Sequence, residues 1–176
     1  RLMEQNRQEQ TSMRYHNITK DDMLNGEGLR VVLWVAGCSH GCPECHNPVT
    51  WDIQGGIPFD EAALEEIRAE LEKEYVSGLT LSGGDPLHPA NRQEIGRLAK
   101  EIREQFPQKT IWLYTGYLWE EIKELTWLGA VDVVVDGEFK IDQKDNSLHW
   151  KGSANQRVID VKESLKKGQA VLYQER

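Results

Sequence analysis

Long apolar segments are absent from this sequence of 176 residues. Its longest apolar run, residues 31–38, has eight residues, whereas a membrane-spanning helix needs about 20. The first 17 residues are almost all polar and lack the apolar core of a secretory signal. We therefore expect a protein without a membrane partner, located in the cytoplasm.

Basic residues are also scarce. The chain has 21 Lys and Arg against 29 Asp and Glu, so its formal net charge is −8. A nucleic-acid-binding surface needs clustered Lys and Arg, and we therefore expect no nucleic-acid partner. The length favours a single domain, which we place at residues 13–176. Residues 1–12 are polar without apolar periodicity, and we interpret them as an N-terminal extension that is disordered or non-native.

Cysteine is rare, and its placement is informative. All three cysteines lie between Cys38 and Cys45, with His40 and His46 in or beside the same segment. An odd number of cysteines cannot form a closed set of disulfides. So close a group of thiols and imidazoles indicates a metal site instead.

The spacing within GCSHGCPECHN leaves more than one metal open. Three residues separate Cys38 from Cys42, and two separate Cys42 from Cys45. Thiolates suit soft metals, but a cubane iron–sulfur cluster normally takes four cysteines. With three, either a different ligand completes the site or one iron stays open to an external ligand. The alternatives are zinc held by the cysteines with His46 or His40, or simply packed thiols.

Apolar strands alternate with amphipathic helices along the rest of the chain. Strands are predicted at residues 29–35, 78–82, 110–114 and 131–135, with later ones at 157–161 and 170–173. Helices are predicted from the N-cap Asp60 to Tyr75, at residues 95–106, from Leu118 to Gly129, and at 162–167. This alternation predicts an α/β fold whose parallel sheet is covered on both faces.

The number of these units predicts an open, partial (β/α) barrel. A complete eight-unit barrel takes about 250 residues, and this chain has four clear units. We expect that little chain remains to build a lid over a small molecule. Catalytic groups in such sheets lie at the carboxyl ends of the strands. The cysteine segment and the GGDP segment each follow a predicted strand, so both should lie at one edge.

Several segments together resemble a known family. CSHGCPECHN has the three-cysteine spacing of the radical S-adenosylmethionine superfamily. CHNPVTW, VVLWVAGC and TLSGGDPL resemble the activating enzymes of glycyl-radical proteins, in particular the activases of anaerobic ribonucleoside-triphosphate reductase. The resemblance extends from about Tyr15 to Val161 and includes YHNITKDDMLNGEGLR and GSANQRVIDV.

The resemblance implies an oxidoreductase with two cofactors. In that family three cysteines, matched here by Cys38, Cys42 and Cys45, hold a 4Fe–4S cluster whose fourth iron binds S-adenosylmethionine. Reductive cleavage yields methionine and a 5′-deoxyadenosyl radical, which takes the α-hydrogen of a glycine in the partner reductase. A low-potential electron donor such as a flavodoxin is implied as well.

The GGDP segment is matched to the loop that receives the cofactor's amino group. Ser82, Gly83, Gly84 and Asp85 correspond to that loop, where glycine removes the Cβ obstacle to close approach. The family more often has Glu at the position of Asp85. Without the cysteines, an ordinary strand-to-helix turn would be the preferred interpretation.

Further cofactor contacts are expected near the third cysteine. Many family members have an aromatic residue beside adenine where this chain has Glu44. We therefore expect adenine to contact the backbone around Glu44 and Cys45, or His46, which could instead be a packing or capping histidine.

Strand ends supply a second group of candidates. Tyr114, Thr115 and Gly116 end one strand and Asp136 ends the next, as cofactor contacts or as turn formers. The segment that contains Asn155, Gln156 and Arg157 matches the family without an assigned role. The rival functions are a radical enzyme acting on a small molecule such as a deazapurine precursor, and a non-catalytic zinc-binding module.

Overall fold

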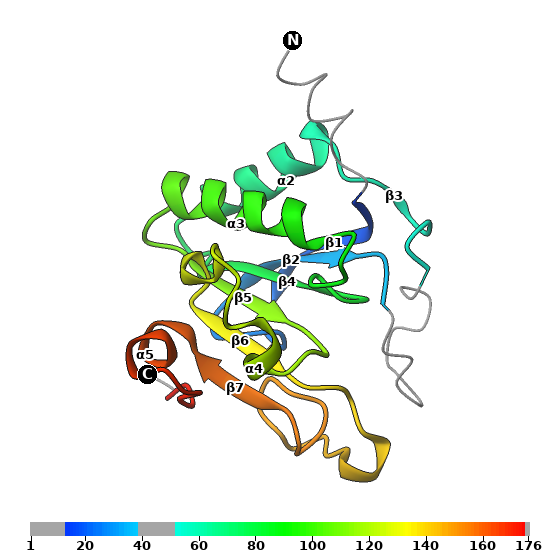
Figure 1. The fold of residues 1–176 in the computed structure, drawn as a ribbon. Coiled ribbons are helices and arrows are strands. Elements are labelled where there is room, and N and C mark those ends of the chain that lie inside the picture. Colours follow the sequence, from blue (N-terminus) through cyan, green and yellow to red (C-terminus); the bar gives the residue numbers. More distant parts are fainter. Residues whose placement is uncertain (1–12, 39–51, 175–176) are drawn as a thin grey trace.

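The computed structural model describes residues 13–38 and 52–174, which form one open mixed sheet with helices packed on it (Figure 1). The proposed N-terminal extension, residues 1–12, lies outside the described residues. In sheet order the strands are β3 (Ile57–Pro58), β1 (Arg14–Asp22), β2 (Arg30–Val35), β4 (Gly78–Gly83), β5 (Thr110–Tyr114), β6 (Val133–Asp136) and β7 (Arg157–Asp160). The α-helices are α2 (Glu61–Leu71), α3 (Arg92–Gln105), α4 (Trp119–Ile122) and α5 (Val161–Lys167).

The centre of the sheet is parallel, as the alternation predicts. Strands β2, β4, β5 and β6 pair in parallel, and each lies within two residues of its predicted position. The two flanking strands differ, because β1 pairs antiparallel with β2 and β7 pairs antiparallel with β6. The prediction of a purely parallel sheet is therefore wrong. A short turn joins β1 to β2, and the segment that joins β6 to β7 contains no α-helix, so neither connection is a helical crossover.

Strand β1 was not predicted as a strand, and its composition explains why. Its sequence, RYHNITKDD, has no apolar alternation, and Ile18 is its only buried residue. The strand is specified by pairing along β2, from Tyr15 opposite Val35 to Asp22 opposite Arg30. Periodicity therefore gives no signal for this strand.

The two faces of the sheet carry different side chains. Toward α2 and α3 the parallel strands present aliphatic residues, which share one core with the helices: Val31, Leu33, Val35, Leu79, Leu81, Ile111, Leu113 and Val134. The intervening positions, which include Arg30, Thr80, Ser82, Trp112 and Tyr114, therefore face the other way. Trp150, from the segment between β6 and β7, packs on that second face. The sheet was expected to be covered by helices on both faces. In the structure the helices cover one face only, and the segment between β6 and β7 packs on the other.

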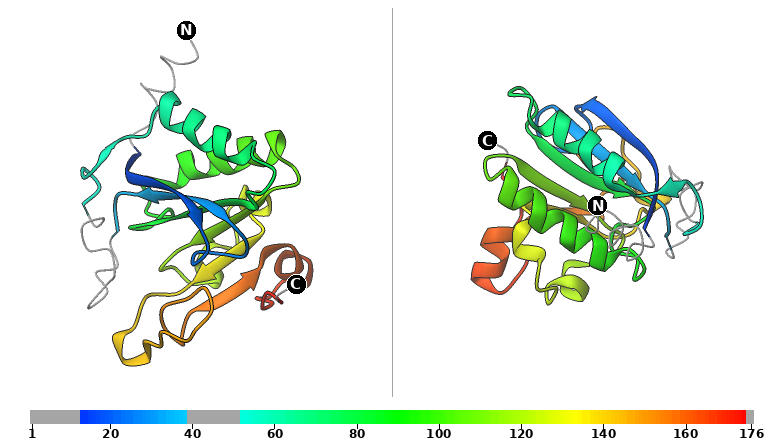
Figure 2. Two further views of the ribbon diagram at one scale, coloured as in Figure 1. Left: turned by 180° about the vertical axis from the view of Figure 1, so that it is seen from behind. Right: turned by 90° about the horizontal axis from the view of Figure 1, so that it is seen from above.

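The first two predicted helices are confirmed, with one corrected end. The Asp60 carboxylate accepts a hydrogen bond from the Ala63 amide at 2.9 Å and caps α2, as predicted. That helix ends at Leu71, and Tyr75, expected on its buried side, is 57% exposed. Helices α2 and α3 lie side by side (Figure 2), where Arg68 of α2 binds Glu101 of α3 at 3.0 Å.

Two later predictions are wrong. The helix expected from Leu118 to Gly129 is the single turn α4, followed by turns and a 3₁₀ helix, Leu128–Ala130. The tighter turns bring the Trp127 ring over Gly96 of α3, where a Cβ atom would lie only 2.5 Å from the ring. The strand expected at residues 170–173 is one isolated bridge between Leu172 and Ile159. No helix within residues 13–38 and 52–174 is long and apolar enough to cross a membrane.

Arg30 joins the amino-terminal ends of three parallel strands on the second face. The side chain is completely buried. Its guanidinium donates to the Thr80 hydroxyl at 2.8 Å, the Leu79 carbonyl at 2.9 Å, and the hydroxyl and carbonyl of Thr110, both at 2.8 Å. The Trp112 ring centre lies 5.6 Å from it. Burial lowers the pKa of Arg30 to about 10, so the group stays charged at neutral pH.

Replacing Arg30 by methionine should lower the free energy of unfolding by about 3 kcal/mol, because an apolar side chain leaves buried acceptors on β4 and β5 without donors. Urea denaturation of the metal-free protein measures the change. Lys166→Met is the control, since Lys166 is 74% exposed and should change stability by less than about 0.5 kcal/mol. Equal stability of the two variants would contradict the assigned role.

Candidate functional site

The cysteine segment and the GGDP segment leave neighbouring strands at the same edge of the sheet. Val35 at the end of β2 and Gly83 at the end of β4 are register partners. The structure therefore confirms that the two segments begin at one edge, as predicted. Cys38 is partly buried just beyond β2. Residues 39–51 lie outside the described residues, so the predictions for His40, Cys42, Glu44, Cys45 and His46 remain predictions.

Gly83 allows the two strand ends to come together. Its φ is +113°, and a Cβ atom there would lie 2.4 Å from both the nitrogen and the oxygen of Val35. No residue with a side chain fits that space, and this conformation favours glycine in any case. Glycine is therefore required at position 83 by the approach of β4 to β2, and a close approach of a cofactor to this loop remains a prediction.

A cavity of about 520 Å³ opens beside Cys38, within the size range of small-molecule sites. Residues at or just beyond the ends of β2, β4 and β5 line this cavity. The predicted site residues that line it are Cys38, Ser82, Gly83, Gly84, Tyr114, Thr115 and Gly116. Asp85 and Asp136 are not among the lining residues.

Asp85 connects two of the loops that border this cavity. The residue is completely buried. Its carboxylate accepts hydrogen bonds from the Leu87 amide at 2.8 Å, the Thr115 hydroxyl at 2.9 Å and the Gly116 amide at 2.9 Å. A direct contact between Asp85 and a cofactor remains a prediction. The geometry shows that the carboxylate fixes the GGDP loop to the end of β5.

The segment between β6 and β7 forms another wall of the cavity, which corrects the expectation that little chain remains for a lid. Trp150 has an uncommon positive φ of 66°, and its carbonyl accepts a hydrogen bond from the Tyr114 hydroxyl at 2.6 Å. The segment is irregular, so hydrophobic periodicity could not identify it. Its lining residues are Gly137, Glu138, Phe139, Leu148, Trp150, Lys151, Gly152 and Gln156.

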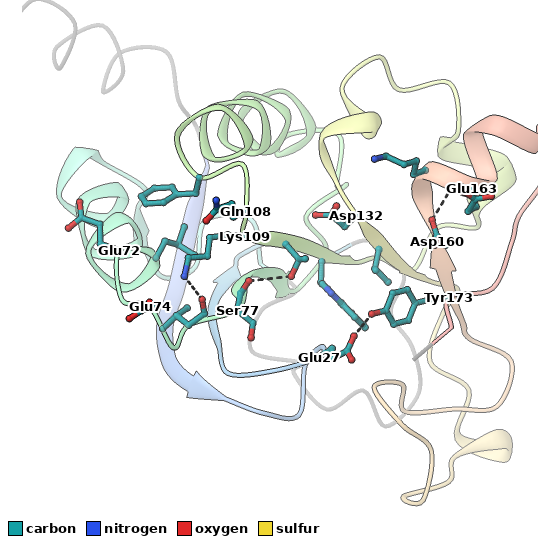
Figure 3. A pocket seen from close by; sticks show the side chains of 17 residues that line it. Glu27, Glu72, Glu74, Ser77, Gln108, Lys109, Asp132, Asp160, Glu163 and Tyr173 are labelled. Carbon is teal, nitrogen blue, oxygen red and sulfur yellow. Dashed lines mark hydrogen bonds between the residues drawn. The ribbon is translucent and has the colours of Figure 1, made fainter. Parts of the chain in front are cut away.

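A larger cavity, of about 1150 Å³, lies at the opposite edge of the sheet (Figure 3). Its charged side chains are largely engaged with the protein. Tyr173 donates to Glu27, Asp160 caps α5 by accepting from the Glu163 amide, and Lys109 donates to the carbonyls of Lys73 and Val76. None of the described residues that line it is a cysteine. The smaller cavity beside Cys38 is therefore the candidate site.

Comparison with known proteins agrees with this choice. Residues 24–159 match a family model described as a 4Fe–4S single cluster domain. The anaerobic ribonucleoside-triphosphate reductase-activating protein of Enterobacteria phage T4 is 46% identical over 146 residues, which are 83% of this chain and 93% of that protein. The proteins of that name from Escherichia coli K12 and Vibrio cholerae are 43% and 40% identical over 150 residues, in each case 83% of this chain and 97% of the relative.

The chain belongs to the family of anaerobic ribonucleoside-triphosphate reductase-activating proteins. The resemblance seen in the sequence is thereby confirmed. The matched region contains the three cysteines, the GGDP loop and the segment between β6 and β7. The family model also supports an iron–sulfur cluster rather than the zinc alternative.

The structure gives Gln156, in the NQRVIDV segment, a structural role in this member of the activating-protein family. Its side chain accepts hydrogen bonds from the amides of Gly152 and Ser153, at 3.0 and 3.1 Å, and donates to the Gly137 carbonyl at 2.9 Å. Asn155 donates to the Glu138 carbonyl at 2.8 Å. These bonds join the two ends of the cavity wall.

Arg157 and Asp136 hold the base of the same wall. Asp136 is completely buried and accepts hydrogen bonds from the Trp119 amide at 2.8 Å and from Arg157 Nε at 3.1 Å. Arg157 also binds Glu120 at 2.8 Å and lowers the pKa of that carboxyl group. Removing Arg157 would leave the buried Asp136 carboxylate without its counter-charge.

Asp85→Asn should lower the free energy of unfolding by about 1–3 kcal/mol. The amide nitrogen of asparagine would face an N–H or O–H group whose hydrogen bond the carboxylate now accepts. Thr115→Val should act in the same direction and more weakly. Since the two side chains touch, the double variant should differ from the sum of the single effects by about 1 kcal/mol. Chemical denaturation measures all three, with the exposed Asp142→Asn as the control. Additive effects would show that the contact contributes nothing.

Proposed function

We propose that this protein activates an anaerobic ribonucleoside-triphosphate reductase by generating a glycyl radical on it. The relatives are named as activating proteins of that reductase. The observation in this chain that supports the proposal is the position of Cys38. Cys38 lines a cavity of small-molecule size. Gly83 and Gly84, which have no side chains, line the same cavity.

The residues present suit the two cofactors. We propose that Cys38, Cys42 and Cys45 hold a 4Fe–4S cluster, since three thiolates leave one iron open. When bound there, the cluster supplies the electron for cleavage of S-adenosylmethionine to methionine and a 5′-deoxyadenosyl radical. The open sheet with its four parallel strands suits a partial (β/α) barrel of the radical S-adenosylmethionine type.

The protein's own groups would bind and orient the cofactor. Ser82, Gly83 and Gly84 border the cavity, and glycine lets a ligand approach the backbone closely. Asp85 and Thr115 keep that loop in place through their hydrogen bond. On the other side Phe139 and Trp150 line the cavity and would present apolar surface to the bound cofactor. We keep Glu44 and His46 as proposed adenine contacts.

A glycine in a protein loop is a suitable substrate for this site. Hydrogen transfer needs reacting atoms within about 3–3.5 Å, so the glycine must reach the cavity itself. Glycine has no side chain to obstruct entry, and the radical at its α-carbon is stabilised by both flanking amides. The reductase loop would then serve as the substrate once per activation, and a low-potential donor such as a flavodoxin would supply the electron in the cytoplasm.

Single replacement of Cys38, Cys42 or Cys45 by alanine should remove most of the bound iron, because two thiolates cannot retain the cluster. Iron and sulfide are quantified after anaerobic reconstitution and gel filtration. A far-ultraviolet circular dichroism spectrum of each variant serves as the folding control. Full iron retention in two of the three variants would rule out the three-ligand assignment, and a colourless zinc protein would support the binding-module alternative.

The deciding experiment is electron paramagnetic resonance on a reduced mixture of the reconstituted protein, S-adenosylmethionine and the reductase. A glycyl-type doublet should grow in the reductase. It should be missing when the radical-site glycine of the reductase is changed to alanine, or when Cys38→Ala replaces the parent. If 5′-deoxyadenosine forms without that doublet while a small heterocycle is consumed, the small-molecule alternative is correct.

A further inference from the structure

Three consecutive carbonyls lead into Cys38, and the neighbouring loop holds each of them. The Val35 carbonyl accepts from the Gly84 amide at 2.9 Å, and the Gly37 carbonyl accepts from the Asp85 amide at 2.7 Å. The middle carbonyl, that of Ala36, accepts from the side chain of Asn91 at 2.8 Å. One side chain therefore completes a contact that is otherwise made by backbone alone.

Asn91 is used in an unusual way. It precedes α3, where asparagine commonly caps a helix, yet its side chain makes no capping hydrogen bond. The side chain is completely buried, and Nδ2 also donates to the Asp85 carbonyl at 3.2 Å. Within the part of the chain that the structure describes, Oδ1 has no hydrogen-bond partner. Burying an unpaired acceptor is unfavourable, so helix stability alone does not account for this arrangement.

We propose that Asn91 is a positioning residue that sets Cys38 against the Gly83–Asp85 loop, an inference that rests on the proposed function. Ala36 lies two residues before Cys38, so a rotation of the peptide after Ala36 displaces the thiolate. The other two carbonyls keep the strand ends paired, but neither fixes that middle peptide. Asn91 bonds to both loops at once and so fixes the cysteine relative to the loop proposed to receive S-adenosylmethionine.

The test compares Asn91→Ser with Asn155→Ser. Serine is too short to reach the Ala36 carbonyl but remains acceptable before a helix. Asn155 provides the comparison from the cavity wall: its Nδ2 donates to a single carbonyl, that of Glu138, its Oδ1 likewise has no partner among the described residues, and its bond lies within the segment between β6 and β7. Asn155 does not line the cavity. A second variant, Asn91→Leu, removes the donor while it keeps the branched shape of the side chain.

Three measurements separate positioning from folding. They are the unfolding of the metal-free protein, the rate at which a chelator removes iron from the reconstituted protein, and the change in the spectrum of the reduced cluster when S-adenosylmethionine is added. Asn91→Ser should lose iron about tenfold faster than Asn155→Ser, the scale expected for a group that orients a metal ligand. Its spectral response to S-adenosylmethionine should be diminished. The metal-free Asn91→Ser protein should also unfold more readily, because the buried Ala36 carbonyl loses its donor, so iron loss and spectral response are compared under conditions in which the unfolding measurement shows both variants to be folded.

Each other outcome is decisive. A parent protein that binds no iron would overturn the proposed function itself. A parent that binds iron, with equal iron loss and equal spectral response in the two serine variants, would overturn only the role of Asn91. If Asn91→Ser does not fold, Asn91→Leu takes its place under the same criteria. Failure of both Asn91 variants to fold would make the residue structural and overturn the proposal.

Discussion

The candidate site depends on one steric constraint, the approach of β4 to β2 at their carboxyl ends. At Gly83 the two backbones lie too close for any side chain between them. Because the strands also run parallel and in register there, the segments that leave them start side by side. The amides of Gly84 and Asp85 then reach the carbonyls that precede Cys38. The beginning of the cysteine segment and the glycine loop are thus a single hydrogen-bonded unit.

The second face of the sheet divides along the strand direction. At the amino ends, Arg30 uses its guanidinium to join three strands, and Trp112 packs beside it. Tyr173 and Glu27 form a further hydrogen bond beside that end. At this half of the face the protein's own side chains are therefore bonded to one another beside the larger cavity. Space for a ligand beside the cysteine is left at the carboxyl ends, where Ser82 and Tyr114 line the cavity.

An irregular segment completes the site of this small protein. The wall between β6 and β7 has no regular strand or α-helix, and it is held instead at its base and along its own backbone. Asp136 and Arg157 form a charged pair at the base, where the carboxylate is completely buried. Gln156 links the return of the segment to its start through Gly137. These contacts hold the aromatic and polar residues that line the cavity, and no further β/α unit is needed to support them.

The sequence alone determined the features that depend on local pattern. The four parallel strands, the start of α2 at Asp60 and the common edge of the cysteine and GGDP segments were predicted because apolar periodicity and capping are local. The cysteine spacing likewise indicated the family that the relatives confirm.

Tertiary structure decided the rest. Strand β1 is defined by its pairing with β2, and the cavity wall by contacts between the two ends of its segment, so periodicity gives no sign of either. Strand β7 was predicted, but its antiparallel direction is set only by its pairing with β6. The roles of Asp85 and Asn91 depend in the same way on distant groups, since Thr115 and Ala36 are brought to them only when the sheet assembles. The residues joined by each of these hydrogen bonds are 30 or more positions apart in the sequence, so the bonds form only when the sheet has assembled.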